Sequence, residues 1–75
     1  MKPEFAYINP RNGKRYHRGM LSEDPRTGRT TIWMTQLFGN ANVKICFESE
    51  VLNRWQKAQV TPDDLAFYHE HIAAR

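Results

Sequence analysis

The sequence predicts an α+β domain in which an antiparallel β-meander of three or four strands precedes two short C-terminal helices packed on one face. Between residues 15 and 48, β-branched and aromatic residues fill short segments separated by turn signals, which is typical of strands joined as hairpins. After residue 49, apolar residues recur every three or four positions, which is the spacing of a helix. With 75 residues, the chain is expected to form one small domain, residues 1–75.

The first predicted turn, Asn9–Gly13, joins a short strand over Phe5–Ile8 to a strand over Lys14–Arg18. Proline fixes φ in this turn, and the Asn-Gly pair tolerates positive φ. A second turn at Ser22–Gly28 again combines an Asp-Pro pair with a late glycine. These two turns predict the first two connections of the meander.

Two further strands are predicted on either side of a turn at Phe38–Asn42. Thr30–Leu37 is rich in β-branched and aromatic residues, and Ile32 and Met34 share one of its faces. Asn42–Glu48 alternates apolar and polar residues, so we expect a half-buried strand with one face in water.

Helices are predicted for the last third of the chain. Ser49 is a suitable N-cap for a helix over Glu50–Gln59. Thr61 followed by Pro62 and two aspartates forms a stronger start, because proline suits the first helical position and Thr61 with Asp64 approximates a capping box. This second helix is expected to end at Ala73 or Ala74.

No arrangement of residues in the sequence predicts an enzyme, a metal site or a cofactor. Cys46 is alone in the middle of a predicted strand, where a semi-buried structural role is expected. His69 and His71 are two positions apart, so on a helix they point in different directions and do not share a metal ion easily. The four glycines are spaced as turn residues, and none opens a helix as a phosphate-binding loop must.

The positive charge is concentrated in the first part of the chain. Residues 1–29 hold seven bases and three acids, a balance of +4, whereas residues 30–75 hold four bases and five acids, a balance of −1. Such asymmetry favours an anionic partner, although Arg-rich turns can also serve only to keep a small sheet soluble. The candidate binding residues are the bases and aromatics in or beside the first two turns and on the strands that follow: Arg11, Lys14, Arg15, Tyr16, Arg18, Arg26, Arg29 and Trp33.

These residue types suit a surface that contacts DNA or RNA, with bases on phosphates and an aromatic ring for stacking. We expect the strand ends near Arg15–Arg18 and Arg29 to pair, because the turn between them joins their strands. Tyr16 and Trp33 could instead fill the core, since a small domain needs its large aromatics there. The leading hypothesis is a non-enzymatic module whose basic sheet face binds nucleic acid.

The alternative hypothesis is a protein-interaction module, such as an inhibitor that docks on a host protein or nucleoprotein complex, because arginine and aromatic residues also dominate protein interfaces. The small size is similar to that of proteins from phages and mobile elements, which include inhibitors of bacterial nucleases. Three strands followed by a helix resemble, in element order alone, the sheet-reading DNA-binding domains of some plant transcription factors and integrase arms.

A third hypothesis is a homodimer formed through the edge of the Asn42–Glu48 strand or through the helix faces. No apolar run approaches the roughly 20 residues of a membrane span, and no secretory signal is recognisable, so a soluble cytoplasmic protein without a membrane partner is expected.

Overall fold

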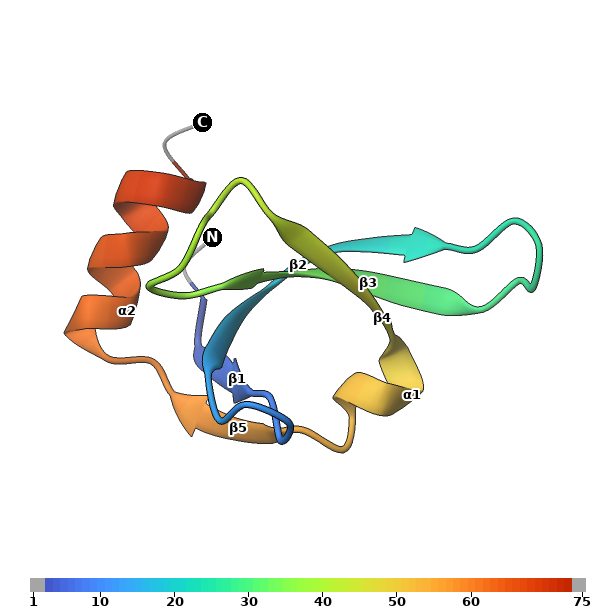
Figure 1. Ribbon diagram of the computed structural model, residues 1–75, viewed down its shortest axis with the longest axis horizontal. Coiled ribbons are helices and arrows are strands. Elements are labelled where there is room, and N and C mark those ends of the chain that lie inside the picture. The colour runs from blue at the N-terminus through green and yellow to red at the C-terminus, as the bar shows by residue number, and fades with distance from the viewer. Residues whose placement is uncertain (1–2, 74–75) are drawn as a thin grey trace.

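Residues 3–73, described by a computed structural model, form an antiparallel sheet of five strands and three short helical segments (Figure 1). The strands lie in the order β4-β3-β2-β1-β5, and the sheet is strongly curved, so that the β1–β5 pair faces back toward β3 and β4. The strands are β1 Phe5–Ile8, β2 Arg15–Glu23, β3 Thr30–Gln36, β4 Lys44–Glu48 and β5 Gln56–Gln59. The helical segments are α1 Ser49–Leu52, α2 Pro62–Phe67 and the π-helix η1 Tyr68–Ile72.

The predicted first hairpin is present. β1 pairs with β2 through Tyr7 opposite Tyr16, and Gly13 has the positive φ of 68° that its place in the turn requires. The turn is closed by the amide of Gly13, which donates to the carbonyl of Asn9 at 2.7 Å, and by the amide of Asn9, which donates to the carbonyl of Lys14 at 3.0 Å. Local sequence therefore determines this connection.

The meander also continues as predicted through β3 and β4, with one irregularity in β2. The register of β2 against β3 shifts between Arg18 and Leu21, which marks a β-bulge. Gly19 lies in this bulge, where a Cβ atom would come within 2.7 Å of the carbonyl oxygen of Trp33. A glycine at this position lets the two strands approach closely.

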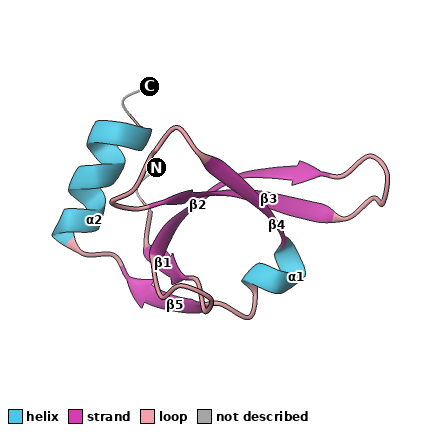
Figure 2. Cartoon of the chain, viewed as in Figure 1, coloured by secondary structure: helices cyan, strands magenta, loops and turns pink. Residues whose placement is uncertain are grey.

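The sheet has one more strand than the largest number predicted, because the predicted helix over Glu50–Gln59 is wrong. The chain is helical only at α1, then turns and enters β5, which pairs with β1 over its whole length (Figure 2). Leu52 and Trp55, whose spacing suggested a helix, are both buried, but Leu52 ends α1 while Trp55 lies in the connection to β5. The free edge of β1 supplies backbone hydrogen-bond partners, which a longer helix could not use.

The core lies on the concave side of the sheet. Its cluster of buried side chains consists of Tyr7, Tyr16, Ile32, Met34, Leu52 and Trp55, with Phe47 packed against it. Ile32 and Met34 share one face of β3 as predicted, and the structure shows that this face is the buried one. The predicted strand Asn42–Glu48 begins only at Lys44, so Asn42 and Val43 precede it. The expected half-buried face is wrong in its first part, because Val43 is 52% exposed and Ile45 is 42% exposed on an edge strand that has a neighbour on one side only.

The two helices contact opposite faces of the sheet, which corrects the predicted packing on one face. Leu52 of α1 packs in the core beside Tyr16, whereas α2 and η1 contact Arg15 and His17, which point to the other side of β2. The predicted cap at Ser49 is also wrong, since α1 begins after Glu48 and has no side-chain cap.

The second predicted helix start is confirmed. The Thr61 hydroxyl accepts a hydrogen bond from the amide of Asp64 at 3.1 Å, the Asp64 carboxylate accepts one from the amide of Thr61 at 2.9 Å, and Pro62 is the first helical residue. The helix changes to π geometry at Tyr68 and ends at Ile72, one residue before the predicted Ala73. Ala74 lies outside the described residues.

Candidate nucleic-acid interface

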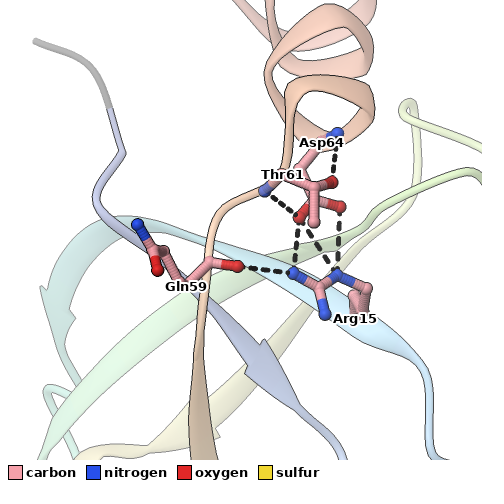
Figure 3. Close-up of polar contacts among 4 residues, drawn as sticks. All are labelled: Arg15, Gln59, Thr61 and Asp64. Atoms are coloured by element: carbon pink, nitrogen blue, oxygen red, sulfur yellow. Dashed lines mark hydrogen bonds and ion pairs between the residues drawn. The ribbon is translucent and has the colours of Figure 1, made fainter.

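Arg15 is committed to the fold. Its guanidinium donates to both carboxylate oxygens of Asp64, with Nε at 3.0 and 3.1 Å, and its Nη2 also donates to the carbonyl of Gln59 at 3.1 Å (Figure 3). Asp64 is 1% exposed, so its charge is compensated inside the protein. A replacement of Arg15 therefore tests the packing of α2 as much as it tests a partner.

Tyr16 and Arg18 have different environments on the concave side of β2. Tyr16 is 2% exposed, and its ring meets Trp55 edge-on at a centroid distance of 5.5 Å, so it is a core residue with no face free for stacking. Arg18 lies over the ring of Tyr7 at 5.6 Å and donates to its hydroxyl at 3.1 Å. Arg18 forms no ion pair with an acidic side chain among residues 3–73.

Arg26 and Arg29 lie far from the other candidates. The strands of Arg15–Arg18 and Arg29 do pair, but the expected proximity of these arginines is wrong. Arg18 lies opposite Met34, whereas Thr30 lies opposite Glu23 at the far end of the hairpin that projects from the sheet (Figure 1). Arg29 there forms an exposed ion pair with Glu48 at 3.1 Å.

Arg11 and Lys14 project from a turn whose backbone is fixed by asparagine side chains. The Asn9 carboxamide oxygen accepts from the amide of Arg11 at 2.9 Å, and that of Asn12 accepts from the amide of Lys14 at 2.9 Å. The Asn12 amide group also donates to the Tyr16 hydroxyl at 3.1 Å, which ties the turn to the core. The two exposed basic side chains are thus presented on a rigid loop.

The pairing of β1 with β5 brings a second basic segment to this end of the sheet. Ile8, the last residue of β1, lies opposite Gln56, the first residue of β5. The turn that follows Ile8 and the connection that precedes Gln56 therefore leave the sheet at the same end, as Figure 1 shows. That connection and the start of β5 carry Arg54 and Lys57, both exposed.

We call this surface the basic end and define it by the exposed bases Arg11, Lys14, Arg54 and Lys57. The two segments that form it, residues 9–15 and 53–57, contain five bases and no acid. None of the four defining side chains has an ion pair within residues 3–73. Lys57 lies over the Tyr7 ring at 5.8 Å, on the ring that Arg18 also contacts. The basic end is thus a concentrated positive surface that attracts anions.

Sequence reasoning missed Arg54 and Lys57 because both were assigned to a helix in the nearly neutral part of the chain. No local signal distinguishes them there. The one relevant feature of the sequence is that residues 53–57 contain two bases and no acid. This feature points to a basic surface only once β5 is known to pair with β1, because that pairing, between residues about 50 positions apart, brings residues 53–57 to the same end of the sheet as residues 9–15.

Trp33 is 39% exposed and lies on the convex face of β3, away from the core. It borders a hollow of about 380 Å³ between the sheet and the end of the C-terminal helix. The residues that line this hollow are His17, Gly19, Met20, Trp33, Thr35, Lys44 and Ile72. Its walls are mostly apolar, and it does not include any residue of the basic end.

His17 lies between this hollow and the C-terminal helix. Its ring contacts that of Tyr68 at a centroid distance of 4.8 Å. Burial lowers the pKa of His17 below its ordinary value of 6.5, because the charged imidazolium would lose its hydration there. The neutral form is therefore favoured near pH 7.

Within residues 3–73, no three His, Cys, Asp or Glu side chains converge on a point where a metal ion could sit. Cys46 is exposed on β4 and not semi-buried as predicted. None of the helices in the described part of the chain has the length and apolar character that a bilayer crossing needs.

Comparison of the chain with protein-family models, with curated proteins and with solved structures gives no match.

Proposed function

We propose that this protein is a non-enzymatic binding module that contacts the phosphates of DNA or RNA through its basic end. The observation that carries the proposal is the meeting of two acid-free basic segments, 9–15 and 53–57, at one end of the sheet. A cluster of lysines and arginines on one surface is the electrostatic footprint of phosphate binding.

The rigidity of the first loop supports the same function. Arg11 and Lys14 belong to a turn closed by two backbone hydrogen bonds and by the side chains of Asn9 and Asn12. A loop that is ordered before binding loses little conformational entropy when it meets its partner. Within residues 3–73, no exposed aromatic ring lies at this end, since Tyr16 and Trp55 are buried. Contacts to the phosphate backbone therefore dominate the proposed interface, and sequence readout is weak.

The test measures the anisotropy of labelled single-stranded and double-stranded DNA and RNA at increasing salt. For about four phosphate contacts on a duplex, log K should fall with log salt at a slope of about −3 to −4. R11E/K14E and R54E/K57E should each weaken binding strongly. The matched control is R26E, which reverses a charge on the distant hairpin turn and should change binding little.

Two results would overturn the proposal. One is the absence of binding to every nucleic acid at low salt by a folded wild-type protein. The other is binding that survives both double replacements and is lost in R26E, which would move the interface to the hairpin turn.

A second candidate function, docking on another protein, is favoured by the apolar hollow beside Trp33. The half-exposed indole and the exposed Met20 would accept an apolar side chain of a partner. In affinity capture after nuclease treatment, this function predicts a stoichiometric protein that is retained by R11E/K14E and lost by Trp33→Ala. Material that disappears with nuclease counts against it.

A further inference from the structure

We propose that two copies of this chain pair through the open edge of β4, in an antiparallel register centred on Cys46. The inference is independent of the proposed nucleic-acid contact, because it concerns the edge of the sheet opposite to β5.

The edge of β4 is available for pairing. β4 pairs with β3 on one side, and the described residues place no strand on its other side. The strand contains no proline or bulge that would block an added strand. Lys44, Ile45 and Cys46 are all exposed.

The backbone of Cys46 points toward this open edge. On β3, the carbonyl of Trp33 is directed toward Gly19 of β2. The amide of Leu37 also points to β2, since it donates to the carbonyl of Arg15 at 2.9 Å. Leu37 is four residues after Trp33, and every second residue of a strand directs its backbone groups to the same side, so the two observations agree. A residue of β3 whose backbone groups form hydrogen bonds with β2 cannot use them for β4. Cys46 lies opposite Trp33, so this position is a non-hydrogen-bonded pair and Cys46 directs its own N–H and C=O away from β3. By the same alternation, Lys44 and Glu48 also direct their backbone groups outward.

The sequence of β4 is complementary to itself when read antiparallel about Cys46. Lys44 of one copy lies opposite Glu48 of the other on the convex face, and Ile45 lies opposite Phe47 on the concave face. By the two-fold symmetry of the pairing, the Lys44–Glu48 and Ile45–Phe47 contacts each occur twice, and the two Cys46 residues face each other at the axis. A shift of the register by two residues would lose the match between the charged pairs.

The apolar exposure at this edge fits the same occupant. Ile45 is 42% exposed, although β4 belongs to the sheet that encloses the core, and Val43, which directly precedes β4, is 52% exposed. A second β4 would cover Ile45 with Phe47 of the other copy. The occupant is therefore a second copy of this chain, chosen by charge complementarity and by the match of apolar side chains.

The first test is sedimentation of the full chain, without nucleic acid, from low micromolar to near-millimolar concentration. We expect a monomer–dimer equilibrium. Lys44→Glu and Glu48→Lys should each weaken the dimer about tenfold, because each places like charges opposite one another. An equimolar mixture of the two variants should restore the dimer, since the two acidic side chains of one variant then lie opposite the two lysines of the other.

Matched variants distinguish this dimer register from other ways in which a charge change could alter association. Arg29→Ala removes the intramolecular partner of Glu48 and should leave the dimer intact. Lys57→Glu reverses a charge on the opposite edge strand and should do the same. Cys46→Pro should abolish the dimer while Cys46→Ala preserves it, because proline lacks the N–H that would donate across the edge.

Cross-linking gives an independent measurement. Directly opposed residues of a hydrogen-bonded antiparallel pair have Cα atoms about 5.5 Å apart, so a short bismaleimide should join the two Cys46 thiols in high yield. A strictly monomeric mass across the whole concentration range would overturn the inference. So would a dimer that tolerates Lys44→Glu and Cys46→Pro but dissociates in Lys57→Glu.

Discussion

Arg15 and Asp64, which are 49 residues apart in the sequence, form the ion pair that fixes the C-terminal helix to the sheet (Figure 3). Asp64 also closes the capping box with Thr61, so one buried carboxylate both begins the helix and joins it to β2. The position of the helix therefore depends on the fold of residues at both ends of the chain.

Replacement of Arg15 by alanine should lower the free energy of unfolding by about 3 kcal/mol, because it leaves a buried carboxylate without its charged partner. Chemical denaturation measures the loss. Arg29→Ala is the control, since its exposed pair with Glu48 should be worth less than about 1 kcal/mol. If both variants lost the same free energy of unfolding, the buried Arg15–Asp64 pair would stabilise the protein no more than the exposed Arg29–Glu48 pair does.

Acid should destabilise the protein through Asp64. Burial alone would raise the pKa of this carboxyl group, but hydrogen bonds from Arg15 and Thr61 and the positive charge of Arg15 lower it below the ordinary 3.8. A lowered pKa in the folded state gives a contribution that is complete above pH 3.8 and is lost as the pH falls through the folded-state pKa. Denaturation measured at a series of acidic pH values should show a smaller loss in Asp64→Asn.

His17 should add a second pH dependence at higher pH. Because burial lowers its pKa below 6.5, the unfolded chain binds a proton before the folded protein does. The free energy of unfolding should therefore be maximal for this group above pH 6.5 and decrease between pH 6.5 and the folded-state pKa. In His17→Gln this decrease should disappear from the measured profile. An unchanged profile would contradict the burial of His17 against Tyr68.

Gly19→Ala should destabilise the sheet by about 1 to 3 kcal/mol, because the new methyl group meets the carbonyl oxygen of Trp33 and the strands must separate. Gly13→Ala provides a comparison, since its Cβ meets open space and its cost of about 1 to 2 kcal/mol arises from the positive φ alone. Thermal denaturation checks both. In a Trp55→Phe background, where Trp33 is the remaining tryptophan, Gly19→Ala should change the fluorescence of Trp33 and Gly13→Ala should not.

Several features encoded within a few residues were predicted correctly, although the N-cap at Ser49 was not. The turn at Asn9–Gly13 and the capped start of α2 at Thr61 depend on the intrinsic preferences of asparagine, glycine, threonine and proline, and these act without the rest of the chain. The strands β3 and β4 likewise follow from β-branched and aromatic residues between turn signals.

β5 could not be predicted from the local sequence. Leu52 and Trp55 have the spacing of a helix, and nothing within Gln56–Gln59 favours a strand. The strand exists because β1 offers an unpaired edge, and that edge is known only once the meander has folded. The same pairing decides the candidate site, since it brings Arg54 and Lys57 to the end of the sheet that carries Arg11 and Lys14.

The sequence by itself determined an α+β chain with a basic first part, its turns and the cap of its last helix, because each depends on short-range chemistry. Only the tertiary structure decided which bases are neutralised and which are free. Arg15 and Arg29 are bound to Asp64 and Glu48, whereas Arg11 and Lys14 lie at the same end of the sheet as Arg54 and Lys57. Charge balance along a chain cannot make this distinction, because electrostatic interactions depend on distances in space.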